Sequence, residues 1–318
     1  MISKMTHAKT LTINEPSIEL SRKNCLGIFI NAEITVENGS STSTTVKIED
    51  ILNKIRFDVR KNNKTALVEM NAFNLALLNL FDANGYLKID GTISIQGDST
   101  AKVVAPLYVD GPFRGAEYSS FDISMSVNQS IGDNLTIKSI NAEVTGVYTD
   151  MDFGDTIIER TKNWFKTSFN AGSYREVLQI NSINAIQQAI IIIRDKNGTR
   201  SDNIVEKIGL RNIGTEKTDI MELGYNSAIM VNKMVFTPKT RPVGVIYMDF
   251  TKELTLDEYG IKAWRLGNDK LYLALESSDE GTVEVITKEL IVNSELIDNP
   301  NPNTDKAEIY DDIRGQYM

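Results

Sequence analysis

The chain has 318 residues, of which 41% are hydrophobic and 24% are charged, which is typical of a soluble globular protein and excludes a disordered or membrane-spanning one. Its formal net charge of −9 argues against a protein that wraps nucleic acid, because such proteins need a basic surface to neutralise phosphates. The length exceeds one comfortable hydrophobic core and therefore predicts two domains.

The first residues carry basic groups but no targeting signal. Lys4, His7 and Lys9 are not followed by an apolar run that could form the centre of a signal peptide, so we expect a protein that is not secreted and a flexible start. Cys25 is the only cysteine, which excludes an intrachain disulfide and fits a reducing cytoplasm. We expect Cys25 to be a small buried hydrophobic residue.

In the first half, β-branched and aromatic residues cluster between turn dipeptides such as Asn38-Gly39, the pattern of a β-sandwich or barrel. The strands predicted there are residues 26–36, 45–59, 86–95, 118–127 and 135–148. A helix is predicted at residues 71–80. Such short turns link antiparallel neighbours.

A second helix is predicted at residues 157–169, where it would join the two halves. Its apolar stripe would consist of Ile157, Ile158, Trp164, Phe165 and Phe169. This stripe could dock the helix onto both units, or the helix could be a lid over one core only.

The second half repeats the β-rich plan. Its predicted strands are residues 189–194, 204–211, 243–250, 271–275 and 282–292, with a helix at residues 255–264. The most apolar run, residues 189–193, is too short to span a bilayer and is rich in isoleucine, so it predicts a buried strand.

Beyond residue 292, asparagines and prolines predict an extended tail. The last residues retain apolar side chains among acidic ones, namely Ile309, Tyr310, Ile313 and Tyr317. This segment could clasp a neighbouring subunit or be a frayed terminus.

Residues 51–79 match residues 204–232 without a gap at an offset of 153, which indicates one β-rich unit built twice. Seven positions are identical, where chance gives roughly two at ordinary residue usage. The identical pairs are Ile51 and Ile204, Lys54 and Lys207, Ile55 and Ile208, Lys64 and Lys217, Thr65 and Thr218, Glu69 and Glu222, and Asn79 and Asn232. Apolar residues also align at Leu52 and Val205, Phe57 and Leu210, Leu67 and Ile220, Val68 and Met221, Met70 and Leu223, Leu77 and Met230, and Leu78 and Val231.

The closing strands, residues 141–148 and 281–288, look alike at an offset of about 141. The alternative is two unrelated β segments that share an apolar rhythm.

Few residues suggest catalysis. His7 is the only histidine, and it lies in the flexible start of the chain, so a catalytic nucleophile would have no anchored histidine base. A single histidine and the single cysteine, Cys25, also cannot supply the usual set of zinc ligands. No phosphate-binding glycine loop is present. Asp150, Asp152 and Asp155 could bind calcium, but they lack EF-hand spacing and favour a solvated loop. The sequence assigns no catalytic, cofactor-binding or metal-binding residue, and it predicts neither an enzyme nor a cofactor.

These features together resemble the double jelly-roll major capsid proteins: two consecutive β units, a short helix between them, and a cysteine-poor, acidic chain without catalytic residues. The resemblance rests on residues 207–230, their counterpart from Lys54, and the closing strand 282–286, which are patterns rather than a diagnostic motif. It covers residues 11–292. It is closest in style to corticovirus-like, membrane-containing icosahedral phages, with the flavobacterial lipid-containing phage as the nearest.

The resemblance implies an all-β fold of two tandem eight-stranded jelly rolls with a short connecting helix. The implied parts are an N-terminal jelly roll at residues 1–156, a helical connector at 157–170, a C-terminal jelly roll at 171–295 and an extended tail at 296–318.

The implied function is that of a capsid protein. Homotrimers would present six jelly rolls as a pseudo-hexagonal tile and contact neighbouring capsomers, paving an icosahedral virion over an internal membrane. Minor capsid or vertex proteins are further partners, direct nucleic acid binding is not expected, and the chain would be made in the host cytoplasm. Lys4 and Lys9 are candidates for contact with anionic head groups. The longest predicted loops are residues 96–117, expected at the outer surface or the threefold contacts, and residues 232–242.

Two other functions stay open. A tandem β-sandwich receptor- or carbohydrate-binding module, such as a phage spike or surface lectin, would need an aromatic cluster, and only Trp164 and Trp264 are present, each in a predicted helix. A carbohydrate-active sandwich enzyme would need a carboxylate pair in a cleft, which the sequence does not identify.

Overall fold

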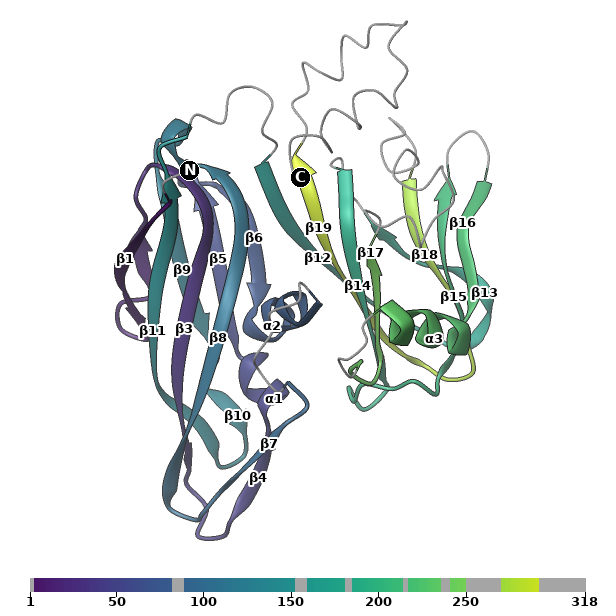
Figure 1. Ribbon diagram of the computed structural model, residues 1–318. Helices are drawn as coiled ribbons and strands as arrows, with labels where there is room; N and C mark the ends of the chain where they lie inside the picture. Colours follow the sequence, from purple (N-terminus) through teal and green to yellow (C-terminus); the bar gives the residue numbers. More distant parts are fainter. Residues whose placement is uncertain are drawn as a thin grey trace, which may run out of the picture. The chain divides into compact units, whose positions relative to one another are not determined.

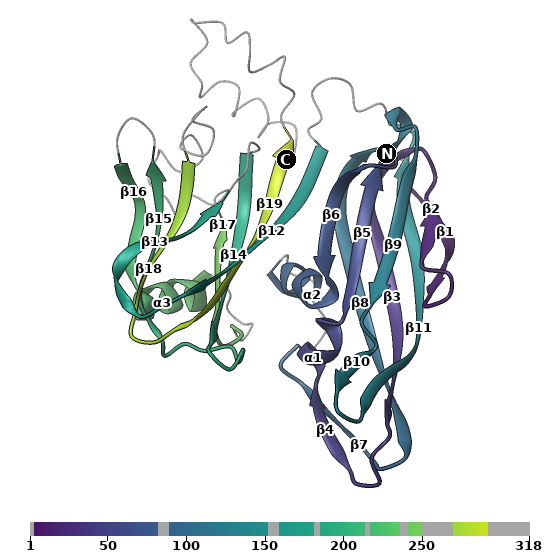
Figure 2. The ribbon, with the colours of Figure 1, turned by 180° about the vertical axis from the view of Figure 1, so that it is seen from behind.

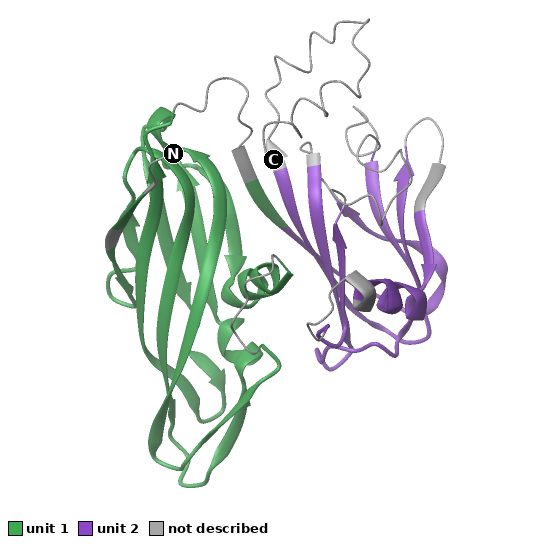
Figure 3. Ribbon diagram, in the orientation of Figure 1, with its two compact units in different colours: residues 1–163 green, residues 164–318 purple. Residues whose placement is uncertain are grey.

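The computed structural model describes residues 3–81, 89–151, 159–180, 185–213, 217–235, 241–249 and 270–291. The chain divides into two compact units, residues 1–163 and residues 164–318 (Figure 3). Strands dominate both units, and the described residues contain three α-helices.

The main part of unit 1 is formed by two rows of four antiparallel strands that lie face to face (Figure 1). The first sheet has the order β1 (Ser3–Thr12), β11 (Leu135–Thr149), β3 (Asn24–Asn38) and β8 (Ser99–Arg114). The second has the order β2 (Ser17–Glu19), β9 (Phe121–Val127), β5 (Ile55–Lys61) and β6 (Thr65–Asn71). Smaller elements are β4 (Thr44–Lys47), α1 (Ile48–Leu52), α2 (Ala72–Phe81), β7 (Thr92–Ile95), the 3-10 turn Gly115–Glu117 and β10 (Ser130–Gly132).

Unit 2 also has two sheets (Figure 2). One has the order β12 (Glu159–Phe169), β19 (Gly281–Ile291), β14 (Ala185–Asp195) and β17 (Val245–Asp249). The other has the order β13 (Gly172–Ile180), β18 (Lys270–Ser277), β15 (Val205–Ile213) and β16 (Lys217–Gly224), and α3 (Tyr225–Val235) follows β16.

The strand order is the same in both units. With each unit's eight principal strands numbered along the chain, one sheet has the order 1-8-3-6 and the other 2-7-4-5. This is the order of a jelly roll, in which two Greek keys form two facing sheets. The predicted all-β fold of two tandem eight-stranded jelly rolls is therefore confirmed for the described residues.

The repeated stretch folds into the same elements twice, namely β5, β6 and α2 in unit 1 and β15, β16 and α3 in unit 2. A register shift skips Leu67 in β6 and Ile220 in β16, which are aligned positions. The pairing partners of these strands differ between the units. Val59 faces Val68 in unit 1, whereas Leu210 faces Met221, the residue aligned with Val68, in unit 2. The residue of β15 that faces the second strand is therefore two positions earlier in the repeat than its counterpart in β5. A two-residue displacement keeps every side chain on the same face, because side chains alternate with a period of two.

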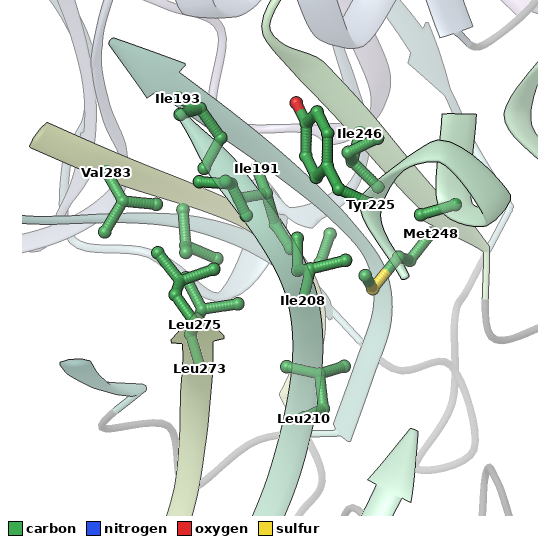
Figure 4. Close-up of a cluster of buried hydrophobic side chains, with 14 of the residues drawn as sticks. Ile191, Ile193, Ile208, Leu210, Tyr225, Ile246, Met248, Leu273, Leu275 and Val283 are labelled. Carbon is green, nitrogen blue, oxygen red and sulfur yellow. The ribbon is translucent and has the colours of Figure 1, made fainter. Parts of the chain in front are cut away.

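Each unit has its own apolar core between its sheets. In unit 2, Ile191 and Ile193 of β14 face Ile208, Leu210 and the neighbouring strand β18 across the interior (Figure 4). Each fully buried aliphatic side chain of this kind stabilises the fold by roughly 1.5–3 kcal/mol. The buried strand predicted at residues 189–193 is confirmed.

The predicted connecting helix at residues 157–170 is wrong over its described part, which is strand β12. The spacing of Trp164, Phe165 and Phe169 fits a helix face, but aromatic and β-branched residues favour strands. Pairing with neighbouring strands decides the outcome. Lys162 pairs with Val68 of β6, and the hydroxyl of Thr161 donates to the Leu67 carbonyl at 2.7 Å.

Two other predictions along the chain are wrong. The single strand expected at residues 45–59 is interrupted by α1, whose first turn carries Glu49 and Asp50, where the helix dipole favours negative charge. The loop expected at residues 96–117 is mainly the long strand β8. Pro106 suggested a loop, but β8 is an edge strand, and a proline is tolerated where no ladder bond from its nitrogen is needed.

The start of the chain is also more ordered than expected, because β1 pairs with β11 and places His7 opposite Thr145. The helix predicted at residues 71–80 is confirmed as α2, which Asn71 caps by accepting a bond from the Asn74 amide at 2.7 Å. The helix predicted at 255–264, most of the loop predicted at 232–242 and the tail at 296–318 lie outside the described residues.

Candidate functional site

The described residues contain no group of three histidine, cysteine or acidic side chains that could hold a metal ion. Asp150 lies on the surface near Lys23, at 3.5 Å between Oδ1 and Nζ, whereas Asp152 and Asp155 lie outside the described residues. Over the same part of the chain, no helix combines the length and apolar character needed to cross a membrane.

Cys25 is fully buried in β3, as predicted, and its Sγ donates to the Gly27 carbonyl at 3.2 Å. Burial raises the pKa of this thiol from 9.0 to about 12. Because the thiolate is the nucleophilic form, Cys25 is chemically inert at neutral pH in the folded protein.

Two clusters of buried charged groups are paired inside the units. In unit 1, the Lys162 ammonium lies 2.6 Å from Asp110 Oδ1 and also donates to the Asp110 carbonyl. In unit 2, the Glu284 carboxylate accepts bonds from Arg194 Nε and Trp164 Nε1, each at 3.0 Å. Trp164 is therefore half-buried on a strand and held by a carboxylate, which is not the arrangement of an open sugar-stacking platform.

An asparagine in each helix binds the edge of a neighbouring strand. Asn79 of α2 donates from Nδ2 to the Tyr108 carbonyl at 2.7 Å and accepts from the Tyr108 amide at 2.8 Å. Asn232 of α3 makes the same two bonds to Tyr247, at 3.0 Å and 2.6 Å. We call each pair of bonds an asparagine latch.

The latches occupy the open edges of two sheets. Tyr108 lies in β8 and Tyr247 in β17, and each strand ends the order of its sheet. A side-chain amide that binds the N–H and C=O of one residue replaces the next strand of a ladder, so the edge cannot pair with another strand at that point. Pro106 lies two residues before Tyr108, so its ring nitrogen is on the same open edge of β8. A proline nitrogen carries no hydrogen and cannot donate to another strand there.

A second contact also holds α3. The carboxylate of Asp202 accepts bonds from the Tyr225 hydroxyl at 3.1 Å and the Gly244 amide at 2.9 Å, and it lies 2.5 Å from the Arg241 guanidinium. Tyr225 is the first residue of α3. Burial raises the pKa of the Tyr225 hydroxyl, so it stays neutral. The Asp202 cluster and the latch thus fix both the start and the middle of the helix.

The outer face of the first sheet of unit 1 exposes apolar side chains. Phe29 is 44% exposed and stacks on the ring of Tyr108 with centroids 4.6 Å apart. Pro106 is exposed on the same strand face as Tyr108, and Val104, one pleat further on, is 51% exposed. We call Phe29, Val104, Pro106 and Tyr108 the sheet patch. Beside it lie ion pairs such as Lys102 with Glu33, at 2.6 Å.

The same positions in unit 2 are buried. Tyr247 is the counterpart of Tyr108, because each is the residue that the latch asparagine binds. On the neighbouring strand, Ile190 pairs with Tyr247 and Phe29 pairs with Tyr108, so Ile190 is the counterpart of Phe29. Ile190 is 0% exposed and Tyr247 is 4% exposed. Ile286, which pairs with Ile190, is also fully buried, whereas Thr145, which pairs with Phe29, is only half-buried. Thr145 and Ile286 are 141 residues apart, so the predicted offset of the closing strands is confirmed.

The helices show the opposite difference. Leu77 and Leu78 of α2 are 0% and 2% exposed, but the aligned Met230 and Val231 of α3 are 64% and 36% exposed. We call Met230 and Val231 the helix patch. The outer sheet face is therefore exposed in unit 1 and buried in unit 2 at these positions. The helix face is buried in unit 1 and exposed in unit 2.

The structure places Lys4 and Lys9 on β1 with exposed side chains. Trp264 and the tail residues from Ile309 to Tyr317 lie outside the described residues. Sequence reasoning missed the sheet patch, because Pro106 and Tyr108 were assigned to a loop. The signal that could have located both patches is the identity of Asn79 and Asn232, which marks where each helix meets its edge strand.

No known protein-family model matches this sequence. No curated protein sequence matches it either.

Solved structures match at low sequence identity over nearly the whole chain. A chain from the atomic structure of Sulfolobus Turreted Icosahedral Virus has a TM-score of 0.78 at 10% identity, covering 98% of this chain and 96% of its own. The major capsid protein P2 of bacteriophage PM2 has a TM-score of 0.57 at 12% identity, with coverages of 92% and 98%. The Faustovirus major capsid protein has a TM-score of 0.55 at 8% identity, with coverages of 91% and 90%.

These similarities show the fold. They confirm the double jelly-roll architecture across both units, while the narrower resemblance to corticovirus-like phages and the flavobacterial lipid-containing phage stays a prediction.

We expect Asn232→Ala to lower the free energy of unfolding by about 2–6 kcal/mol, because the Tyr247 N–H and C=O each lose a bond in a buried place, at ~1–3 kcal/mol per group. Urea denaturation followed by circular dichroism measures this. The matched control is Asn226→Ala, at an exposed position of the same helix, which should change stability by less than about 0.5 kcal/mol. Equal effects of the two variants would show that the latch contributes nothing.

We expect the stability that the Cys25 thiol contributes to be complete below pH 9 and lost as pH rises to about 12, because the unfolded thiol ionises at 9.0 and the folded one only at about 12. Wild type should therefore lose stability relative to Cys25→Ala when both are denatured in urea above pH 9 rather than at neutral pH. Parallel pH profiles of the two proteins would contradict the raised pKa. As an independent check, iodoacetamide at neutral pH should label Cys25 only after unfolding.

Proposed function

We propose that this chain is the major capsid protein of an icosahedral virus and that it assembles as a homotrimer with six jelly rolls in a pseudo-hexagonal capsomer. The observation that carries the proposal is the identical strand order of the two units, together with similarity to viral capsid chains that covers nine-tenths or more of both partners. In this proposal, residues 1–156 and 171–295 are the two jelly-roll domains and residues 296–318 are a tail.

The physical argument concerns symmetry. Two copies of one fold in a single chain place six similar units around a threefold axis, and such a tile can meet six neighbours in similar ways. Jelly rolls suit this role because most strand edges are paired or covered, which leaves sheet faces and loops for lateral contacts. Self-association and contacts between capsomers, and a location in the virion capsid, follow from the proposal. Synthesis in the host cytoplasm is also part of it.

We expect the purified protein to have a solution mass of three 35.5-kDa chains by light scattering, and its particles to have a hexagonal outline in negative-stain microscopy. Closed threefold symmetry is what assembly of a shell from such tiles requires. A monomer at every concentration would contradict the capsomer and would favour the tandem binding module, for which a glycan screen would be the next measurement.

We also propose that the capsid encloses an internal membrane, which the capsomer contacts with its basic N-terminal strand. The support is local. Lys4 and Lys9 lie exposed on β1, and each basic residue close to an anionic lipid surface contributes about 1 kcal/mol to binding. Minor capsid or vertex proteins would be further partners at positions that the threefold tile does not fill.

We expect the protein to float with vesicles that contain phosphatidylglycerol but not with pure phosphatidylcholine vesicles, and we expect Lys4→Glu with Lys9→Glu to abolish flotation. The matched control is Lys138→Glu with Lys102→Glu, because these exposed lysines also lie on unit 1, on other strands. If both double variants float equally well, β1 is not the membrane contact.

A further inference from the structure

The edge of β6 in unit 1 is covered by a strand that comes from later in the chain. β12 starts within unit 1, where Lys162 pairs with Val68 of β6 in a parallel arrangement. Beside this pair, the Thr161 hydroxyl donates to the Leu67 carbonyl at 2.7 Å. The same strand continues along the chain as the first strand of unit 2. In unit 1, a fifth strand thus receives the start of a first strand.

The equivalent edge of unit 2 is β16, the fifth strand of that unit. It ends the order of its sheet, and no further strand pairs with it in the described part of the chain. The register shifts of β6 and β16 fall at aligned positions, Leu67 and Ile220. A bulged residue leaves the regular ladder, and in β6 it is the bulged Leu67 whose carbonyl binds Thr161. β16 therefore repeats the backbone feature that receives β12.

The repeat is also well preserved along this edge strand. Three of its seven identities lie in β6 and β16 or next to them: Lys64 with Lys217, Thr65 with Thr218, and Glu69 with Glu222. The unit 1 members of these pairs are exposed, so packing in the core does not account for the identities. A contact that both edges make is a physical reason for them.

The strand of unit 1 that corresponds to β12 is β1, which also ends its sheet. β1 lies against β11 as β12 lies against β19. Glu143 of β11 faces Thr10, and Glu284 of β19, 141 residues after Glu143, binds Trp164. Thr10 and Trp164 thus occupy similar places, and the start of β12 corresponds to the part of β1 just before Thr10.

We propose that the edge of β16 in one chain receives β1 of a second copy, in the parallel arrangement that β6 and β12 adopt. This inference rests on the proposed trimer and names the strands that form it. Because β1 and β16 are different surfaces, the contact is head-to-tail, and three such contacts form a closed ring when the rotation between copies closes. Every junction around the ring then joins a fifth strand to a first strand.

The other sheet edges favour this pairing. The asparagine latches occupy β8 and β17, and β2 has three residues. β13 is the other long edge of the sheet that contains β16, so it provides a control. Strand pairing uses backbone groups, whereas the side chains of Lys4 and Lys9 project from the sheet faces, so the contact leaves them available to lipid.

The test uses Lys9→Cys combined with Glu222→Cys in one chain, treated with a short bis-maleimide. Both positions are exposed, and Glu222 follows the residue aligned with Val68. Cys25 is buried and does not interfere. We expect covalent dimers and trimers on denaturing gels from the double variant, dimers alone from the two single variants expressed together, and no linking from either single variant by itself.

The matched control combines Lys9→Cys with Arg175→Cys, which is an exposed position on β13 at the opposite edge of the same sheet. This pair should not link, because the proposed contact involves β16 and not β13.

Hydrogen–deuterium exchange of the wild-type protein keeps the test independent of substitutions. Amides in residues 3–10 and 217–224 should include some that exchange at least tenfold more slowly in the trimer than after dilution to monomers, because pairing protects the amides at a strand edge. Residues 172–180 of β13 should exchange equally in both states.

The outcomes separate the two proposals. A stable trimer that links through Arg175→Cys, gives no covalent species or leaves exchange in β1 and β16 unchanged would overturn this pairing while the capsomer stands. Linking by one single variant alone would show a contact between identical surfaces, and a link within one chain would show that the two edges meet inside the subunit. Either result overturns the inference. A protein that is always monomeric overturns the capsomer and this contact together.

Discussion

The open edge of a β-sheet is the constraint on which this architecture depends. An eight-stranded jelly roll closes most edges by pairing strands, but β8 and β17 still end their sheets with outward backbone groups. In both units a single asparagine, Asn79 or Asn232, supplies one donor and one acceptor to that edge. A covered edge cannot recruit a strand from another chain, so each latch protects its sheet from edge-to-edge association.

The same bonds determine where the helices lie, and therefore which side chains are presented outward. An asparagine bound to a strand edge fixes the rotation of its helix, so the residues just before it have a defined direction. In α3 these residues are Met230 and Val231, and in α2 they are Leu77 and Leu78. One hydrogen-bonding requirement thus links control of the sheet edges to the direction of the side chains that precede each asparagine.

Much of this fold follows from local sequence, and the errors have a common cause. The repeated segment identified two units, because the alternation within β5, β6 and their counterparts survives in both copies. Its identical asparagines are now explained by the latches. The errors fell on β12, β8 and β1, three strands whose state depends on partners far away in the sequence. Trp164 and Phe165 satisfy a helical spacing, and Pro106 breaks an alternating pattern, yet pairing across the sheet outweighs both signals. The patches were invisible for the same reason, since exposure of Phe29 or Met230 depends on tertiary packing.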